Sequence, residues 1–265
     1  MEEVADFTDV NIELYKPRDV FLDFHDRQQR WAVIIAHRRA GKTVSCINDA
    51  LWRAITEGKE NARYAYIAPY YAQAKSIAFD YLMQFSESAR VRHNISELWV
   101  ELFNGARIRL FGADNPDALR GMYLDGVVLD EYADMRSPKV WGEVIRPLLT
   151  DRNGMNGYKT WAVFIGTPKG LGNDFYDKYM TEDSQVTKYK LPACDVDEFG
   201  QIRSTLSPYA NMGEIQHAHE QLPKDAFDQE YLAEFTRPSG TVYSDWPLDN
   251  FKEVSGDSEP RPLEL

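Results

Sequence analysis

Apolar residues along the chain occur in two alternating patterns. Short uncharged runs fit strands that are buried on both faces of a parallel sheet, and longer stretches have the spacing of helices. The expected strands span residues 31–36, 63–68, 126–130 and 160–166. The expected helices span residues 42–56, 71–85, 137–149 and 172–180. Strands that alternate with helices in this way are typical of an α/β domain with a mostly parallel central sheet.

One stretch departs from this parallel pattern. SELWVELFNGARIRLFG alternates apolar and polar residues on both sides of Asn104-Gly105. An Asn-Gly pair between two alternating runs is the strongest short-range signal of a hairpin turn. We therefore expect strands at 97–103 and 106–111 to pair antiparallel.

The pattern changes again after residue 191. A polar loop is followed by two helical stretches, at 211–222 and 224–235, and the last 25 residues have no long periodic pattern. We therefore expect three segments, with a small helical, lid-like subdomain between the core and a linker. They are residues 1–191, 192–240 and 241–265.

The charge of the chain is acidic overall and uneven along its length. The net charge is −12, and residues 182–265 alone contain 17 acidic and 7 basic side chains. Residues 31–181 contain 19 basic and 17 acidic side chains. Any contact with a nucleic-acid backbone must therefore use a local patch of the middle segment.

Composition also indicates the cellular compartment in which the chain works. No run approaches the roughly 20 apolar residues of a membrane span, and the acidic N-terminus has no apolar signal core. Cys46 and Cys194 are too far apart in sequence for a disulfide framework. We expect a reducing, cytosolic compartment and no membrane partner.

The first chemical motif follows the first strand. Gly41, Lys42 and Thr43 lie between that strand and a helix, which is the context of a phosphate-binding loop. Lys42 would reach the β- and γ-phosphates of ATP, and the Thr43 hydroxyl would bind Mg²⁺. Ala36 replaces the first glycine of the usual pattern at the strand end, where alanine requires only a small adjustment of the loop. The expected cofactor-binding residues are Ala36, His37, Arg38, Arg39, Ala40, Gly41, Lys42 and Thr43.

The second motif is the acidic pair Asp130-Glu131 at the end of the strand GVVLD. Side chains at the carboxyl ends of parallel strands point into the crevice where ligands of open α/β sheets bind. Asp130 is therefore the expected second residue of the Mg²⁺ site. Glu131 is placed to polarise an attacking water, which a hydrolase needs and a kinase does not.

Three further positions complete the candidate site. Thr167 follows a central strand, where a hydroxyl can sense the γ-phosphate. Arg38 and Arg39 lie within the loop, so at least one can fold back toward the γ-phosphate and pair with its oxygens. Arg120 lies in a loop that could face a neighbouring subunit.

Five segments together point to a family. HRRAGKT, YIAPYYAQAK, LFGADNPDALRG, VVLDEYAD and GTPKGLGNDFY resemble, in order and spacing, the large terminase subunit of tailed bacteriophages. The resemblance runs from about Lys16 to Leu191. It implies a RecA-like ATPase of the additional-strand, catalytic-glutamate (ASCE) P-loop class, which powers the movement of double-stranded DNA into a procapsid. In that family an RNase H-like nuclease domain follows the ATPase.

The resemblance also implies partners and roles. The expected partners are DNA, the portal protein and the small terminase subunit. The chain would form a ring on the portal, in the host cytoplasm, on assembling procapsids. Lys42 and Thr43 take the Walker A roles, and Asp130 and Glu131 the Walker B and catalytic-base roles.

The resemblance assigns three more roles. Thr167 is implied to couple hydrolysis to movement. Arg38 matches the family's loop arginine, a charge stabiliser or conformational sensor. An arginine at the position of Arg120 acts in trans in some members.

The sequence departs from the family in two ways. Phe21 stands roughly where the family's adenine-reading glutamine is expected, and Gln28 or Gln29 could substitute for it. The chain also ends before any array of acids that could bind two metals, so we expect ATP hydrolysis without DNA cleavage. Two alternatives stay open, a single-lobe fragment of a superfamily-2-like helicase and a nucleotide-gated binding module.

Overall fold

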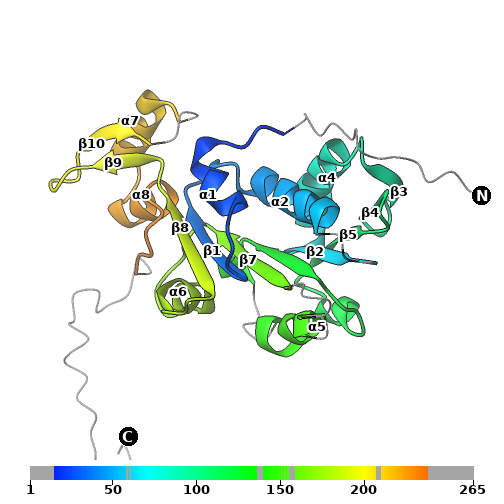
Figure 1. Cartoon of the computed structure of the whole chain (residues 1–265). Helices are drawn as coiled ribbons and strands as arrows, with labels where there is room; N and C mark the ends of the chain where they lie inside the picture. Colours follow the sequence, from blue (N-terminus) through cyan, green and yellow to red (C-terminus); the bar gives the residue numbers. More distant parts are fainter. Residues whose placement is uncertain are drawn as a thin grey trace, which may run out of the picture.

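An eight-stranded sheet forms the centre of the molecule (Figure 1). The computed structural model describes residues 15–57, 59, 61–135, 140–150, 152–154, 159–206 and 210–237. The strand order is β3-β4-β5-β2-β6-β7-β1-β8. The strands are β1 (Trp31–Ala36), β2 (Arg63–Ala68), β3 (Arg90–Asn94), β4 (Trp99–Leu102), β5 (Arg107–Gly112), β6 (Gly126–Asp130), β7 (Trp161–Gly166) and β8 (Val186–Leu191). The six strands from β5 to β8 in this order pair in parallel, and β3 and β4 form an antiparallel extension at one end.

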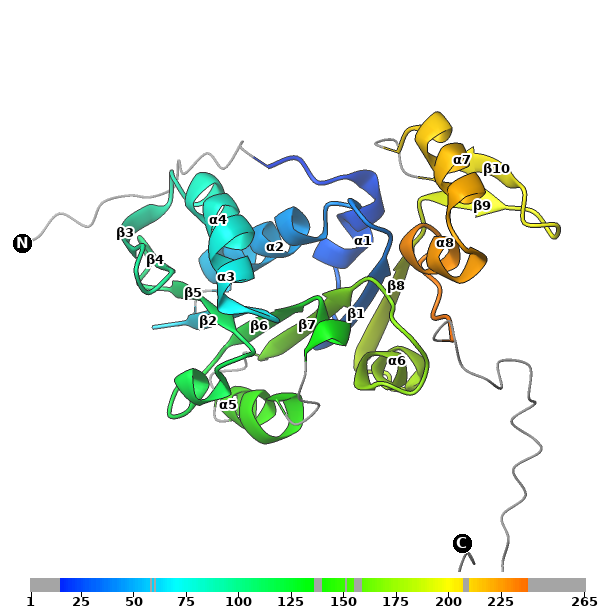
Figure 2. The ribbon, with the colours of Figure 1, turned by 180° about the vertical axis from the view of Figure 1, so that it is seen from behind.

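Helices cover both faces of this sheet, as Figures 1 and 2 show. The face that carries Ile34, Tyr66 and Val163 packs against α2 and α4. The alternate residues of the same strands pack against α5 and α6 on the other face. The core helices are α1 (Leu22–His25), α2 (Lys42–Thr56), α3 (Tyr71–Gln73), α4 (Phe79–Phe85), α5 (Arg146–Thr150) and α6 (Asp174–Met180). Burial on both faces explains why the central strands carry uncharged runs.

Most of the elements expected from the sequence are present. β1, β2, β6 and α2 have the expected bounds, and β7 begins one residue later than expected. The helix expected at 71–85 is confirmed as a continuous run, but its middle, Ala74–Ala78, is π-helical. α6 begins at Asp174 because the Asn173 side chain caps it by accepting from the backbone N–H of Tyr176.

The helix expected at 137–149 and the expected hairpin are confirmed with adjusted bounds. The first part of that helix lies outside the described residues, and the rest is the π-helix Val140–Ile145 followed by α5. In the hairpin, β4 and β5 pair antiparallel around Asn104-Gly105, with Trp99 opposite Arg109. Next to the turn, β4 ends at Leu102 and β5 begins at Arg107, each one residue farther from the turn than expected.

Two strands of the main sheet were not expected. β3 reads RVRHN and β8 reads VTKYKL, and neither has an apolar run. Both are edge strands, with one neighbour and partly exposed faces. Charged side chains are common on edge strands because they discourage pairing with another sheet. Periodicity alone therefore does not reveal these two strands.

A small subdomain lies beside β8, at the opposite end of the sheet from β3 (Figure 1). It contains β9 (Cys194–Val196), β10 (Ile202–Thr205), α7 (Met212–Gln221) and α8 (Lys224–Glu230). The prediction of a polar loop after residue 191 was wrong, because β9 and β10 form a two-stranded antiparallel sheet there. α8 ends five residues before the expected end at 235. Ala193, Cys194, Ile215 and Phe227 form a separate core for this subdomain.

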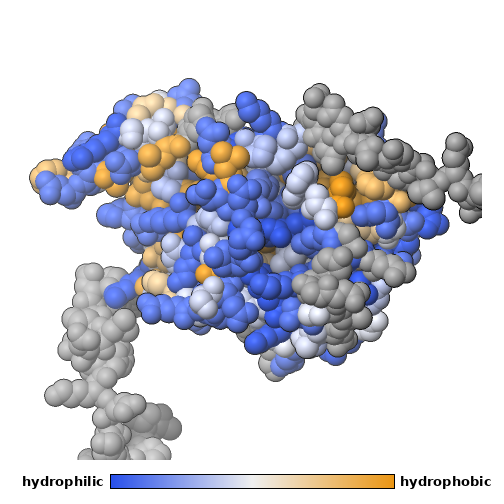
Figure 3. Space-filling view, in the orientation of Figure 1, coloured by the Kyte–Doolittle hydropathy of each residue, from blue (hydrophilic) through white to orange (hydrophobic). Residues whose placement is uncertain are grey.

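The subdomain also exposes apolar side chains. Phe199, Leu206 and Leu222 are among its exposed residues, and apolar surface is visible over this part of the molecule in Figure 3.

The chain then returns to the main domain, where the ring of Phe235 contacts aromatic rings of α6. The linker expected at 241–265 lies outside the described residues, and the division at residues 191 and 240 stays a prediction. No helix in the described part of the chain is long and apolar enough to span a membrane.

A buried ion-pair network attaches the N-terminal segment to α2. Asp49, on α2, accepts two hydrogen bonds from Arg27, each 2.8 Å long. Arg53 and His25 also contact its carboxylate, at 3.2 and 3.4 Å. Burial alone would raise the pKa of Asp49, but Arg27, His25 and Arg53 outweigh it and hold the pKa well below its usual range. The carboxylate therefore stays charged inside the protein.

We expect the Arg27→Met substitution to destabilise the fold by about 3–5 kcal/mol, because it leaves the Asp49 charge buried without its main partner. Urea unfolding monitored by circular dichroism measures this loss. Arg92→Met is the control, since Arg92 pairs with Glu101 through a side chain that is 67% exposed. That control should change stability by less than about 1 kcal/mol. Similar losses in the two variants would contradict the assignment of the network as a buried anchor.

Candidate nucleotide-binding site

The turn between β1 and α2 has the backbone of an anion-binding loop. Arg39 and Gly41 both have left-handed conformations, with φ of 65° and 98°. Left-handed residues within a tight turn bring successive N–H groups to one side, where they can surround an anion. The loop then enters α2 at Lys42, so the helix N-terminus faces the same point. The local structure expected for a phosphate-binding loop is therefore present.

Lys42, Glu131 and Thr167 meet at the carboxyl edge of the sheet. The Lys42 ammonium donates to the Thr167 hydroxyl at 3.3 Å and lies 3.5 Å from a carboxylate oxygen of Glu131. The backbone N–H of Thr167 donates to the other oxygen of Glu131 at 3.3 Å. These residues follow β1, β6 and β7, which are neighbours in the sheet. The structure thus brings together three of the residues expected at the site.

Glu131 is held in an unusual backbone conformation. Its φ and ψ are 44° and 49°, a left-handed conformation that is uncommon outside glycine and is often found at functional sites. Gly166, at the end of β7, allows this arrangement. A Cβ atom added to Gly166 would lie 3.3 Å from Glu131 Cα and from the backbone nitrogen of Tyr132. The small residue before Thr167 therefore lets the Glu131 turn approach β7 closely.

The Tyr66 hydroxyl supports the buried carboxylate of Asp130. Tyr66 donates to Asp130 at 2.5 Å. Burial raises the pKa of the Tyr66 hydroxyl well above its usual value, and the nearby Thr43 side chain acts in the opposite direction. The second oxygen of Asp130 accepts from the backbone N–H of Glu131 at 3.0 Å. Burial, with the neighbouring charge of Glu131, raises the pKa of Asp130 to about 6. A hydroxyl and a buried carboxylate are oxygen ligands that fit Mg²⁺, which usually takes few protein ligands and completes its shell with water and phosphate.

The remaining loop residues hold the loop in place or face outward. Ala36 is fully buried as the last residue of β1. The backbone N–H groups of His37 and Arg38 donate to the carbonyls of Leu191 and Glu230 at 2.9 and 3.0 Å. Burial, followed by the nearby positive charges, lowers the pKa of His37, which favours its neutral form. The side chains of Arg38 and Arg39 are exposed and make no ion pair with any described residue.

Arg120 pairs with an acidic residue of its own loop. It follows the 3₁₀ helix Pro116–Leu119, and its side chain is 66% exposed. Its guanidinium pairs with Asp117 at 2.7 Å. Within one chain the structure does not bring Arg120 to Lys42, so a catalytic role for it requires a neighbouring subunit. That role stays a prediction.

Two of the three positions considered for adenine recognition are engaged within the chain. Phe21 is fully buried in the core, and the Gln28 side chain donates to the carbonyl of Asp26.

Three residues that were not expected at the site support it from other segments. Arg18 donates to the loop carbonyls of Arg39 and Ala40, Tyr66 donates to Asp130, and Gly166 makes room for the Glu131 turn. In the sequence, only its position in the pair Pro17-Arg18 marks Arg18 as a candidate. Tyr66 and Gly166 lie in strands, where their side-chain type alone carries no functional signal.

Comparison with known protein families places the chain among viral packaging proteins. A model of the N-terminal part of the terminase large subunit, T4-like-virus type, matches residues 33–246. The terminase large subunit of Thermus phage G20c is 29% identical over 257 residues, which covers 87% of this chain and 51% of that protein. The corresponding subunit of Escherichia phage T5 is 26% identical over 239 residues, with 87% and 50% covered. The chain therefore spans about half the length of these curated relatives.

Solved structures show the same fold. The large terminase ATPase domain of Thermus phage P74-26 has a TM-score of 0.67 and 25% identity, covering 85% of this chain and 96% of that one. The large terminase of bacteriophage D6E, in complex with ATP-gamma-S, has a TM-score of 0.61 and 15% identity, covering 82% of this chain and 51% of that one. The predicted RecA-like fold, a mostly parallel sheet flanked by helices, is confirmed.

We expect Tyr66→Phe to lower the free energy of unfolding by about 1–3 kcal/mol, because the buried Asp130 carboxylate loses its side-chain donor. Tyr64→Phe is a matched control on the same strand. Tyr64 donates to Glu57, which keeps Lys59 and Arg53 as partners. Chemical unfolding of both variants compares the two losses. A loss for Tyr66→Phe no larger than that of the control would contradict the proposed support of Asp130.

Proposed function

The chain belongs to the family of terminase large subunits, and we propose that it is the motor domain that hydrolyses ATP to drive double-stranded DNA into a procapsid. The observation that carries this proposal is the meeting of Lys42, Glu131 and Thr167 beside a phosphate-binding loop. A loop that binds phosphate, a carboxylate that can activate water and a hydroxyl on the adjacent strand are the parts that ATP hydrolysis requires.

The first step is binding of the triphosphate. The left-handed residues of the loop and the N-terminus of α2 favour an anion at this point, and Lys42 adds a full positive charge. ADP and ATP-gamma-S complexes of the D6E terminase support a nucleotide site in this fold. Thr43 and Asp130 would hold Mg²⁺, which neutralises charge on the phosphates when bound.

Glu131 and Lys42 exchange partners when the triphosphate binds. In this structure the Lys42 ammonium pairs with Glu131. Phosphate oxygens carry more negative charge than one carboxylate, so they draw the ammonium away and leave Glu131 able to accept a proton from water. Thr167 touches both Lys42 and Glu131, so its position changes with theirs. This contact is the proposed route by which γ-phosphate loss reaches the loop after β7.

The arginines stabilise the charge that develops during hydrolysis. Arg38 acts within its own subunit, since it lies in the loop. Arg120 acts on the site of a neighbour in a ring assembled on the portal.

We propose DNA, the portal protein and the small terminase subunit as partners, on procapsids in the host cytoplasm. We also propose that this chain does not cut DNA itself.

Family membership argues against the alternative of a helicase fragment. A nucleotide-gated binding module remains the second alternative, and one substitution separates it from a motor. We expect Glu131→Gln to keep ATP affinity within about threefold and to lower turnover by about 100- to 10,000-fold, because the general base is lost. Calorimetric titration with ATP and phosphate release measure the two quantities. Lys42→Ala, which should lose binding itself, is the control. Wild-type turnover in Glu131→Gln would contradict the hydrolytic role.

The assignment of Arg120 to a neighbour's site predicts complementation between two inactive variants. Arg120→Ala should lower turnover by about 1,000-fold. Mixing it with Glu131→Gln should restore part of the activity, because the second variant supplies Arg120 to a site that keeps Glu131. A mixture of Arg38→Ala with Glu131→Gln should stay inactive, since Arg38 acts in cis. Phosphate release at high protein concentration reports each mixture, and failure of the first mixture would refute the trans role.

A further inference from the structure

Arg18 contacts the phosphate-binding loop although it lies more than twenty residues before it. Its Nη1 atom donates to the carbonyl of Ala40 at 2.7 Å and to that of Arg39 at 3.3 Å. A Cβ atom added to Gly41 would lie 3.0 Å from the same nitrogen and 3.1 Å from Cζ. The guanidinium therefore packs against Gly41 and binds the two preceding carbonyls. Arg18 contacts three consecutive residues of the loop.

These three residues define the shape of the loop. Arg39 and Gly41 have left-handed backbones, and a left-handed arginine is unfavourable unless its surroundings stabilise it. A backbone that turns N–H groups inward leaves carbonyls that need donors elsewhere. Arg18 supplies such a donor to the carbonyls of Arg39 and Ala40. Its contacts thus favour the conformation in which the loop presents N–H groups to an anion.

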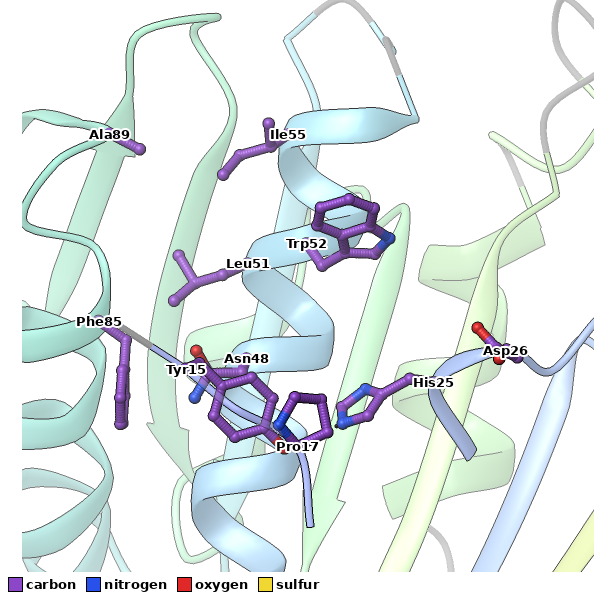
Figure 4. A pocket seen from close by; sticks show the side chains of 10 residues that line it. All are labelled: Tyr15, Pro17, His25, Asp26, Asn48, Leu51, Trp52, Ile55, Phe85 and Ala89. Carbon is purple, nitrogen blue, oxygen red and sulfur yellow. Dashed lines mark hydrogen bonds between the residues drawn. The ribbon is translucent and has the colours of Figure 1, made fainter. Parts of the chain in front are cut away.

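The segment that carries Arg18 is itself anchored on α2. Figure 4 shows Tyr15, Pro17 and His25 beside this helix, where they line a cavity of about 310 Å³. The Tyr15 hydroxyl donates to Ser45 at 3.2 Å and hydrogen-bonds with His25 at 3.0 Å. On the other side of Arg18, Phe21 is fully buried in the core. Arg18 is therefore held between two fixed points, close to the start of α2.

We propose that Arg18 is a positioning residue of the nucleotide site, which holds residues 39–41 in the shape that receives the triphosphate. The inference rests on the proposed binding of ATP to this loop. It assigns a role to a residue outside the phosphate-binding motif. Arg18 acts through the backbone of the loop and does not need to touch the nucleotide.

Replacing Arg18 with lysine distinguishes a geometric role of the side chain from a purely electrostatic one. A lysine at position 18 keeps the positive charge near the phosphates. Both hydrogen bonds come from the one nitrogen Nη1, but a lysine ammonium lacks the planar guanidinium that lies against Gly41, so it cannot keep that packing while it binds the carbonyls. If Arg18 acts through geometry, Arg18→Lys should behave like Arg18→Ala. If it acts through charge alone, Arg18→Lys should behave like the wild type.

The experiment compares the wild type with Arg18→Lys, Arg18→Ala and Lys16→Ala. Lys16 is exposed and two positions away, so its substitution removes the same charge without a contact to the loop. Calorimetric titration with Mg-ATP should show affinity roughly 10- to 100-fold weaker for both Arg18 variants, the loss expected for hydrogen bonds from a charged donor. Lys16→Ala should stay within about twofold of the wild type, as expected of an exposed charge that makes no close contact.

Amide hydrogen exchange without nucleotide provides a second readout. Both Arg18 variants should speed exchange of the amides at residues 37–42 and leave the protection of β1 and β7 unchanged. Wild-type affinity in Arg18→Lys, or unchanged loop exchange in both variants, would overturn the proposal. Faster exchange throughout the core would also overturn it, because Arg18 would then stabilise the fold and not the loop. If the wild type fails to bind ATP, the proposed function is wrong, and the exchange result still decides whether Arg18 holds the loop.

Discussion

The contact of the Lys42 ammonium with Glu131 and Thr167 is the interaction on which the account of this protein depends. It is possible because β6, β7 and β1 are parallel neighbours, so their carboxyl ends lie at one edge of the sheet. A parallel arrangement needs helices on both faces, and the two hydrophobic clusters on opposite sides of the sheet meet that need. The core thus places three polar side chains, far apart in sequence, within hydrogen-bonding distance.

Several features of the fold follow directly from residue patterns. The strands that carry the site are buried on both faces, so uncharged runs such as WAVIIA and GVVLD mark them clearly. The residues that form the site also lie where strands end, and this predicts that Lys42, Glu131 and Thr167 come together. Edge strands β3 and β8 were missed because their exposed faces carry charges. β9 and β10 were missed because they are short and belong to a small core with few apolar residues.

The residues that support the site were harder to predict, and the reason is physical. Arg18, Tyr66 and Gly166 act through contacts between segments that are distant in sequence. Nothing in the composition around Tyr66 shows that its hydroxyl donates to Asp130. Segments outside its own motif also hold the loop. Arg18 donates to the carbonyl of Ala40, and the carbonyl of Glu230, at the end of α8, accepts from the backbone N–H of Arg38. Its shape therefore depends on both the N-terminal segment and the C-terminal subdomain.

A crystal structure of this chain with Mg²⁺ and a non-hydrolysable ATP analogue would show whether Lys42 leaves Glu131 for the phosphates. We expect a triphosphate enclosed by amides of the loop and of the first turn of α2, with Lys42 on its phosphates and Thr43 and Asp130 facing the metal. Glu131, released from Lys42, should then lie within hydrogen-bonding distance of a water beside the γ-phosphate. A nucleotide bound elsewhere, with the Lys42–Glu131 ion pair intact, would contradict the account.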